Sequence, residues 1–318
     1  MLLSTMALLA AMQAQGFQTD TTFSVPQGTR LHVETQGGDI IIRAWDRNQV
    51  RVQAAHSRRT HIDVRIRGAV VLLEAEADRG PANMVDYTIT VPAWMSLGLE
   101  GMYTAIDVTG VRGAITAETL EGDITIKGPA ESVKLESVQG RITVQGIRGS
   151  TTINTVSESI EASDIQGDIL AESVSGNIVL RRIDSRVVEA ETVSGEIILD
   201  GRIVDGGRYS LLTHSGELMV TVPEGANATI ATATGSGDVR ASFPLPASER
   251  PSRRRQTFRL GSGSATVELE SFSGSIRLLR PAEMESRLER MMLGREERVK
   301  EKQKRPEHDR DTFDQDRS

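Results

Sequence analysis

The 318-residue chain has no cysteine, few aromatic residues and no apolar run long enough to span a bilayer. The lack of cysteine excludes disulfides, thiolate metal sites, cysteine nucleophiles and lipid-modified cysteines. Aromatic residues make up only 3% of the chain, so the core cannot be anchored mainly on Phe, Tyr and Trp. The apolar residues are chiefly Ile, Val, Leu and Ala, which suits a core of stacked aliphatic side chains.

An excess of positive charge is also absent. The formal net charge is −7 at pH 7, and the basic residues are mostly scattered arginines. A protein that binds nucleic acid needs a patch of Lys and Arg to neutralise phosphates. The sequence shows no basic stripe interleaved with aromatic residues, so we expect no nucleic-acid partner.

Residues 1–14 (MLLSTMALLAAMQA) form a short apolar stretch that ends in small residues. A membrane-spanning helix needs about 20 apolar residues, so this stretch is instead typical of a secretory signal peptide cleaved after Ala14. No Lys or Arg precedes Arg30, so the basic start of such a signal is missing. We expect an exported protein, periplasmic, surface-bound or secreted, with no transmembrane helix in the mature chain.

The strongest signal is an internal repeat that begins with Thr or Ser, has Gly at the fourth position and apolar residues at the sixth and eighth. The first four regular rows start 18 residues apart, and later ones 19 to 21 residues apart. The row starts are Thr119, Ser137, Thr155, Ser173, Thr192, Thr213 and Thr234, with further copies at Thr35 and Ser271. The fourth-position glycines are Gly38, Gly122, Gly140, Gly176, Gly195, Gly216, Gly237 and Gly274, with Glu158 as the exception. The sixth position holds Ile40, Ile124, Ile142, Ile160, Ile178, Ile197, Leu218, Val239 and Ile276.

Each repeated position has a physical reason. Residues six and eight lie two apart and therefore point to one face of a strand. The glycine comes where the chain turns into that strand, and we expect it to need a backbone angle that a side chain forbids. A second alternating patch follows about nine residues later, as at Val133 and Leu135. Coils stacked in register would align like side chains in continuous ladders about 4.8 Å apart. The prediction is an all-β, parallel β-solenoid with coils of about 18–21 residues.

A left-handed hexapeptide helix, the fold of many acyltransferases, also has an 18-residue coil. It would need an aliphatic residue at every sixth position. Six-residue steps from Ile124 reach Ala130 and Glu136, and steps from Ile142 reach Arg148 and Asn154. The hexapeptide pattern fails, and the acyltransferase interpretation fails with it.

The chain divides by composition into several segments. Residues 22–280 are assigned to the solenoid, with irregular and wider coils at the N-terminal end and the regular coils at 101–242. Residues 243–256 (FPLPASERPSRRRQ) interrupt the pattern and are expected to form an exposed Arg- and Pro-rich loop. Residues 281–304 are predicted to form a charged amphipathic helix that covers the open end of the last coil, and residues 305–318 a disordered tail.

The repeated T/S-V-S-G-x-I-x-L rows, the opening segment VETQGGDIIIRAWD and the closing segment FSGSIRLLR resemble the bacterial putative-adhesin family of β-strand repeats. The resemblance covers about residues 25–280. It implies a β-solenoid on exported or envelope-linked proteins, in a family defined as a domain of unknown function. The family has no assigned catalytic residues, so none are carried over to this chain.

Candidate catalytic and metal-binding residues do not form recognisable motifs. The five histidines lack the spacing of a zinc site, and the Gly-Asp pairs at Asp39, Asp123, Asp168 and Asp238 lack a calcium-repeat pattern. The third-position serines have no repeated base beside them, and we expect them to form a hydroxyl ladder that bonds turn backbones. No catalytic residue, metal or cofactor is therefore predicted.

One charged segment is a candidate binding site. Arginine side chains suit phosphate and other anions, and five of them cluster around the interrupting loop: Arg250, Arg253, Arg254, Arg255 and Arg259. The favoured interpretation of the whole chain is a non-catalytic exported module that binds an unknown envelope protein or polysaccharide, or associates with itself. The alternatives are a polysaccharide-active β-helix enzyme, and an envelope-stress sensor that contacts the membrane or an anionic polymer.

Overall fold

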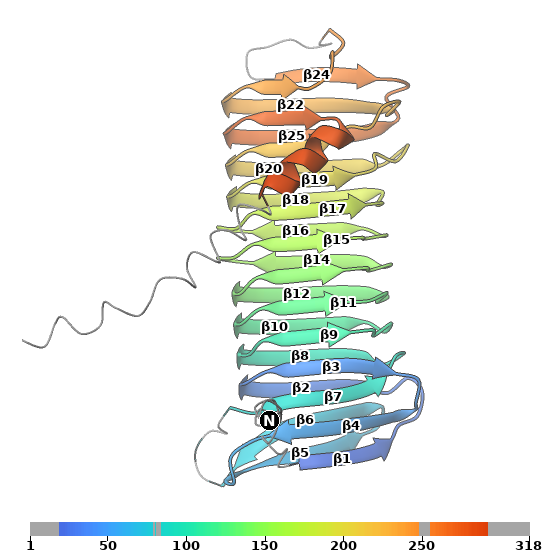
Figure 1. Ribbon diagram of the computed structural model, residues 1–318, viewed down its shortest axis with the longest axis vertical. Helices are drawn as coiled ribbons and strands as arrows, with labels where there is room; N and C mark the ends of the chain where they lie inside the picture. The colour runs from blue at the N-terminus through green and yellow to red at the C-terminus, as the bar shows by residue number, and fades with distance from the viewer. Residues whose placement is uncertain (1–18, 79, 81–83, 248–254, 292–318) are drawn as a thin grey trace, which may run out of the picture.

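The computed structural model describes residues 19–78, 80, 84–247 and 255–291. The chain winds into a straight rod in which the regular coils each place one strand in each of two 13-stranded sheets (Figure 1). Sheet A contains, in spatial order, β1 (Thr19–Ser24), β4 (Gln49–Ala55), β7 (Asp86–Pro92), β3 (Ile40–Trp45), β9 (Ile106–Thr109), β11 (Ile124–Lys127), β13 (Ile142–Gln145), β15 (Ile160–Ser163), β17 (Ile178–Ile183), β19 (Ile197–Gly201), β21 (Leu218–Thr221), β26 (Ile276–Leu279) and β23 (Val239–Ala241). Sheet B contains β24 (Arg255–Leu260), β22 (Ala228–Ser236), β25 (Ala265–Ser273), β20 (Arg208–Ser215), β18 (Val187–Ser194), β16 (Ile169–Ser173), β14 (Ser150–Thr155), β12 (Ser132–Gln139), β10 (Ile115–Glu121), β8 (Ser96–Tyr103), β2 (Arg30–Gly37), β6 (Val70–Ala77) and β5 (Thr60–Arg67).

The predicted fold class is confirmed: the middle of the chain is a parallel β-solenoid. Ile124 lies opposite Ile142, Ile142 opposite Ile160, and Ile160 opposite Ile178 on successive strands of sheet A. The same register continues through Ile197 to Leu218. A constant coil length thus places chemically alike side chains above one another.

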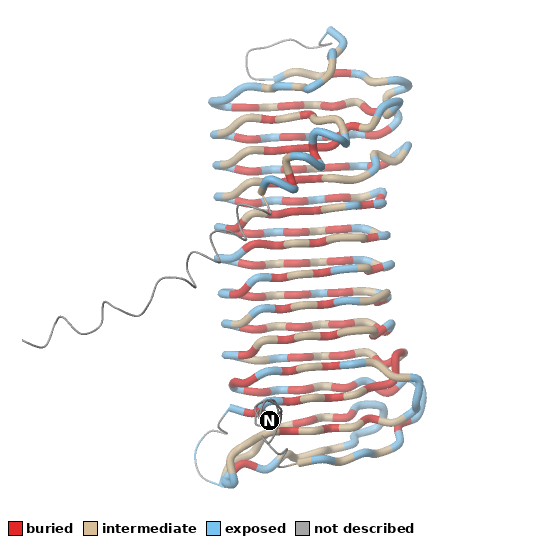
Figure 2. The backbone as a smooth tube through the Cα atoms, viewed as in Figure 1, coloured by how far each residue is buried: buried red, intermediate tan, exposed pale blue. Residues whose placement is uncertain are grey.

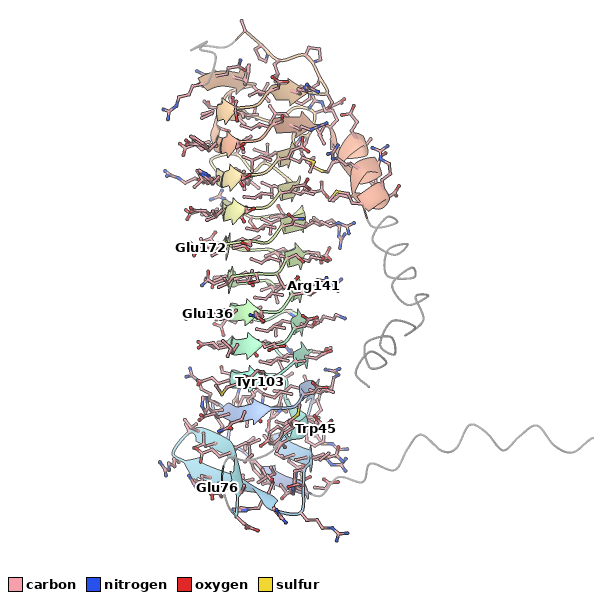
Figure 3. The ribbon with its side chains drawn as sticks, turned by 90° about the vertical axis from the view of Figure 1, so that its left-hand side faces the viewer. Trp45, Glu76, Tyr103, Glu136, Arg141 and Glu172 are labelled. Atoms are coloured by element: carbon pink, nitrogen blue, oxygen red, sulfur yellow. The ribbon has the colours of Figure 1, made fainter. Side chains whose placement is uncertain are left out.

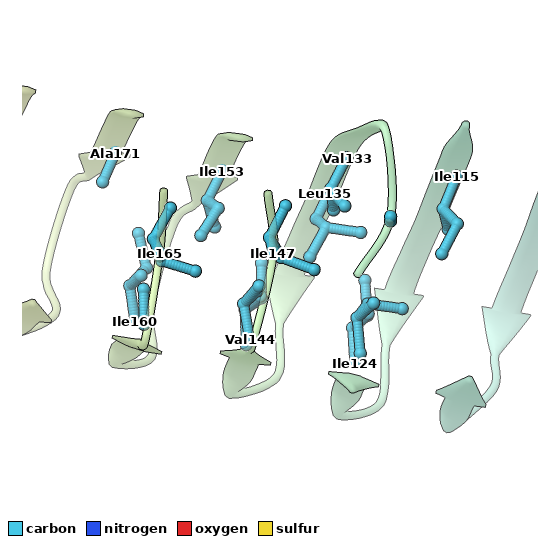
Figure 4. Packing of buried hydrophobic residues seen from close by; sticks show 14 of the residues in the cluster. Ile115, Ile124, Val133, Leu135, Val144, Ile147, Ile153, Ile160, Ile165 and Ala171 are labelled. Carbon is cyan, nitrogen blue, oxygen red and sulfur yellow. The ribbon is translucent and has the colours of Figure 1, made fainter. Parts of the chain in front are cut away.

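The core lies between the two sheets and is almost wholly aliphatic. Burial alternates along most strands, with inward residues buried and outward residues exposed or half-buried (Figure 2), whereas β17, β19 and β21 have runs of residues buried on both faces. Ile124 and Val144 of sheet A face Ile115, Leu135 and Ile153 of sheet B across the interior (Figure 4). Each buried aliphatic side chain contributes roughly 1.5–3 kcal/mol relative to exposure, so stacking supplies the stability that aromatic anchors provide elsewhere.

The coils at the two ends do not stack in sequence order, which corrects the expectation of simple stacking. The coil of β25 and β26 lies between the coil of β20 and β21 and that of β22 and β23. The coil of β2 and β3 likewise lies between that of β6 and β7 and that of β8 and β9. In both places two coils that are consecutive in sequence lie on either side of a third coil.

Strand pairing at the ends is also partly antiparallel, where parallel pairing throughout was expected. The strands β1, β4 and β5 pair antiparallel at the N-terminal end, and β24 does so at the C-terminal end. A short turn joins β5 to β6, so the chain reverses there directly. The strands β1, β4 and β24 pair instead with strands that are not their neighbours in sequence, and they extend the sheets where the coil repeat stops.

The fourth-position glycines do not have the backbone angles that the sequence suggested. Only Gly38 and Gly122 of the eight have a positive φ, 96° and 140°. What the others share is a close approach between coils: a Cβ on Gly140 would lie 1.9 Å from the carbonyl oxygen of Gly122. A Cβ on Gly216 would lie 1.9 Å from the carbonyl oxygen of Gly195. Glycine is favoured at this position because the backbone of a neighbouring coil lies where its side chain would begin, and Glu158 is the one exception.

Those carbonyl oxygens also accept hydrogen bonds from the first-position Thr and Ser hydroxyls, which point inward. Thr192 donates to the carbonyl of Gly176 at 3.1 Å, and Thr213 donates to that of Gly195 at 3.1 Å. Ser271 donates to the carbonyl of Gly216 at 3.0 Å. The expected hydroxyl ladder is therefore in the first position, and the third-position serines, Ser175 among them, are exposed.

The C-terminal helix does not cover the end of the rod. Its described part, residues 281–291, packs on the outer face of sheet A. Met284 and Leu288 are buried against Val179, Ile198 and Met219, which stand on three successive coils. The helix docks there because sheet A is apolar on its outer face at these coils, whereas the end of the rod is already closed by antiparallel strands. Within the part of the chain that the structure describes, no helix is long and apolar enough to cross a membrane.

Two buried tyrosines differ in how their hydroxyls are satisfied. The Tyr209 hydroxyl accepts a hydrogen bond from the Val204 backbone N–H at 2.8 Å and donates to the carbonyl of Ser185 at 2.9 Å. The Tyr87 hydroxyl has no hydrogen-bond partner among the described residues. Burial raises the pKa of both phenols.

We expect Tyr209→Phe to lower the free energy of unfolding by about 1–3 kcal/mol, because it leaves buried backbone groups unpaired. Tyr87→Phe removes only a hydroxyl that makes no bond, and we expect it to be neutral or stabilising. Urea unfolding at pH 7 measures both. Equal losses in the two variants would contradict the hydrogen bonding described here.

The same tyrosines predict a loss of stability in alkali. A folded-state pKa above the unfolded value of about 10 contributes stability below pH 10, which disappears as the pH rises through the folded pKa. We expect Tyr87→Phe to lose less stability than the wild type between pH 9 and pH 11, since the variant has one buried phenol fewer. Urea titrations across that range measure the slope, and identical slopes would contradict the effect of burial at Tyr87.

Candidate functional site

The candidate residues that the structure describes lie apart from one another and have separate structural contacts. His214 stacks its ring on Phe272, with the centroids 4.9 Å apart. The Asp123 carboxylate accepts the backbone N–H of Arg141 on the next coil at 2.8 Å, which is a structural task. Among the described residues, no group of three His, Asp or Glu side chains could hold a metal ion.

The arginine cluster is only partly placed. Arg255 and Arg259 lie exposed on β24, the edge strand of sheet B at the C-terminal end of the rod. Arg259 donates to the carbonyl of Ser262 at 2.8 Å. Arg250, Arg253 and Arg254 lie outside the described residues, as do residues 1–14 and 292–318. An anion site at this loop stays a prediction.

A ladder of glutamates runs up the outer face of sheet B and was missed in the sequence. Glu34 lies opposite Glu100, Glu100 opposite Glu118, and Glu118 opposite Glu136. Beyond Asn154 the ladder resumes, and the side chains of Glu136 and Glu172 point to the same side of the rod (Figure 3). Adjacent carboxylates stand one coil apart, about 4.8 Å between backbones.

Few cations lie close to this ladder. Lys134 pairs with Glu136 at 2.8 Å, and the hydrogen bond to Glu136 raises the pKa of Lys134. His32 lies 3.9 Å from Glu100. Like charges in a column repel one another. A cationic partner that paired with these glutamates would reduce that repulsion.

An exposed apolar stripe runs beside the glutamates along the edge where sheet B turns toward sheet A. It consists of apolar second-position residues, between 38% and 62% exposed, on successive coils from Met102 to Val193 and again at Phe272, with His214 on the coil between Val193 and Phe272. Its members are Met102, Leu120, Val138, Val156, Val174, Val193 and Phe272. Scattered exposed apolar residues are ordinary, but a continuous apolar patch marks an interaction surface.

The stripe and the glutamate ladder share a groove of about 480 Å³. Its walls are Glu34, Glu100, Glu118, Glu136, Asn154, Met102, Leu120, Val138 and Val156, together with the Thr and Ser residues between them. We call this feature the ladder groove. It offers a partner apolar contact along one side and carboxylates along the other.

A second, smaller hollow holds both tryptophans of the chain. Trp45, Trp94 and Arg112 contribute to a cavity of about 230 Å³ near the N-terminal end. The indole N–H of Trp45 donates to the carbonyl of Gln49 at 2.7 Å, and that of Trp94 donates to the Asn48 side chain at 3.0 Å. Arg47 lies over the Trp45 ring, 5.2 Å from its centroid. Because these polar and ring contacts are internal, the hollow offers a ligand less than the ladder groove does.

The sequence did carry a signal for the ladder groove. Glutamate precedes the first-position Thr or Ser in most rows, as at Glu118, Glu136, Glu172 and Glu191. This position lies directly before the Thr or Ser that begins the repeat motif. The second-position valines belong to the motif, but the sequence motif does not show which way they point.

The match to a family model agrees with the family resemblance of the sequence. The sequence model of the family described as Toastrack DUF4097 matches residues 28–279, and no curated protein matches the chain. Similar solved structures include one titled a putative adhesin from Bacteroides fragilis, with 13% identity, a TM-score of 0.35, and 82% of this chain and 96% of that one covered. Another is titled a putative adhesin from Parabacteroides distasonis, with 9% identity, a TM-score of 0.34, and 83% and 97% covered. A third is titled a putative cell adhesion protein from Clostridium sporogenes, with 10% identity, a TM-score of 0.23, and 82% and 99% covered.

Proposed function

This chain belongs to the Toastrack DUF4097 family, and from that premise and the surface just described we propose that it is a non-catalytic binding module. The observation that carries the proposal is the exposed apolar stripe from Met102 to Val193, which lies on a rigid rod. A monomeric protein gains nothing in stability by exposing such a stripe, whereas a binding protein buries it in a complex.

The place of action follows from the apolar segment at residues 1–14, the candidate export signal. We propose that the mature rod acts in the cell envelope or outside the cell, as a structural, adhesive or binding module. A cysteine-free rod with in-register coils keeps a fixed surface without depending on the redox state of its surroundings.

The test is retention of an envelope component on the immobilised mature chain. We expect wild type and the control variant Thr125→Lys, on the outer face of sheet A, to retain the same component. The double variant Val138→Lys/Val156→Lys should lose it, because both charges lie in the stripe. If the stripe variant retains that component as well as wild type does, the stripe is not the binding surface.

The alternatives give different results. A polysaccharide-active enzyme would release products from a glycan panel, and the two tryptophans at the smaller hollow would be the place to mutate first. A sensor that contacts membranes would co-sediment with anionic vesicles and lose that ability when residues 281–318 are removed. We expect neither result from a binding module.

A further inference from the structure

We propose that the ladder groove binds an amphipathic helix of a partner protein, one whose apolar face is flanked by arginine or lysine. This inference rests on the proposed binding function and names the class of partner. It comes from three observations: a helix already docked on the same rod, the spacing of the coils, and the charge of the groove.

The protein itself shows how a helix seats on an outer ladder of this solenoid. Met284 and Leu288, one helical turn apart, pack on the aliphatic ladder of Val179, Ile198 and Met219. Beside that ladder, Glu217 accepts a hydrogen bond from Arg287 of the helix at 2.9 Å. The contact therefore combines an apolar ladder, a solenoid glutamate and a helix arginine.

The ladder groove repeats these elements on the opposite side of the rod with no helix in place among the described residues. Figure 3 shows the docked helix on one side and Glu136 and Glu172 on the other. Leu120, Val138 and Val156 would take the part of the covered ladder, and Glu118 and Glu136 the part of Glu217. The groove has more glutamates than the covered site, so it favours a helix with more than one cation.

The spacing of the coils suits a helix that lies along the rod. One helical turn rises 5.4 Å and one coil about 4.8 Å, so the two drift apart by only about 2 Å over the three steps from Met102 to Val156. Same-face residues of an extended strand repeat at about 6.7 Å, so over the same three steps a strand would drift by about 6 Å, more than one coil.

The charge of the groove selects between a foreign helix and a second copy of this chain. Two rods joined groove to groove would bring two glutamate ladders together, and that arrangement is opposed by like charge. A helix with arginine or lysine on one flank would instead pair with Glu100, Glu118 and Glu136.

The experiment uses a labelled synthetic peptide of about 16 residues, long enough for measurable helicity. It carries Leu or Met at positions i, i+4, i+7 and i+11 and arginines along one flank, and a matched peptide has glutamate in place of each arginine. Fluorescence anisotropy with the full chain is expected to detect the arginine peptide and not its glutamate counterpart. Val138→Lys should weaken binding at least tenfold, while Val193→Lys, in the stripe but outside the groove, should change it less than twofold.

The glutamates are tested separately. Glu118→Gln/Glu136→Gln should reduce both the affinity and its dependence on salt, with the melting temperature unchanged or raised. Equal binding of the two peptides, or no loss with Val138→Lys, would overturn the helix proposal. If those peptides fail while envelope retention still depends on the stripe, the helix proposal is wrong and the binding function stands. A dimer of the wild type that Val138→Lys dissociates would identify a second copy as the occupant and also overturn it.

Discussion

Gly140→Ala is expected to destabilise the rod by about 3 kcal/mol or more, the upper end for overpacking. The added Cβ would lie 1.9 Å from the Gly122 carbonyl oxygen and 2.9 Å from the Ser137 hydroxyl. Because the carbonyl belongs to the backbone of the preceding coil, it cannot rotate away, and the two coils must separate. Equilibrium unfolding in urea measures the loss.

Gly98→Ala is the matched control. Its Cβ would meet the His32 side chain at 2.9 Å, and that half-exposed ring can move. Ala also suits a strand better than Gly does, so we expect a change within about 0.5 kcal/mol. Similar losses at the two glycines would show that coil contact is not what the repeated glycine provides.

Ile142→Asn is expected to cost about 4 kcal/mol or more. Ile142 is fully buried between Ile124 and Ile160. The substitution removes roughly 2–3 kcal/mol of apolar burial and adds an amide without partners, which costs another 1–3 kcal/mol. Since each coil is stabilised by its neighbours, we expect the whole rod to lose cooperativity at this point.

Thr143→Asn makes the same residue type on the outward side of the same strand. There the amide faces solvent, and we expect a change below about 1 kcal/mol. Circular dichroism during thermal unfolding compares the two variants. If both lower the melting temperature equally, the inward and outward sides of β13 have been assigned wrongly.

The middle of the rod could be predicted because its coil length is constant. With a constant coil of 18 residues, Ile124, Ile142 and Ile160 must share a face once any one of them is buried. The physical reason for the glycine, a backbone angle closed to side chains, holds at Gly38 and Gly122 but was predicted wrongly for the other glycines of the column. A sequence shows that a side chain is excluded at Gly140, but not whether the backbone angle or a neighbouring coil excludes it.

The two ends could not be predicted, because stacking order is not encoded in spacing. The row that ends the repeat, with Ile276, fits equally well after Val239 or before it by residue type. In the structure it lies between Leu218 and Val239, where its strand gains two neighbours. The docking place of the C-terminal helix could not be predicted either. It depends on Met219, which points outward on a strand that is buried on both faces.

The ladder groove was predictable in part. The glutamate before each Thr or Ser is visible as a column, and strand alternation puts Glu118 outward once Ala117 and Thr119 are buried. Alternation also puts Val138 outward, next to buried Ser137. Its exposure was harder to foresee because an apolar residue stands on the solvent side of the strand.

The coils stack in register, and the coil of β25 and β26 lies between two coils that precede it in sequence. Because the chain has no cysteine, pairs of spin labels can be attached to introduced cysteines without interference. Pulsed electron–electron double resonance measures the distance between a spin label at Glu118→Cys and one at a second introduced cysteine on the same outward column. These distances report the stacking order directly.

The pairing places Glu191 four coils from Glu118, Glu270 six and Ala233 seven. At about 4.8 Å per coil, the backbone distances should be about 19, 29 and 34 Å. We expect Glu270 to be nearer to Glu118 than Ala233 is. A shorter distance to Ala233, or distances that do not grow by a constant step per coil, would contradict this stacking order.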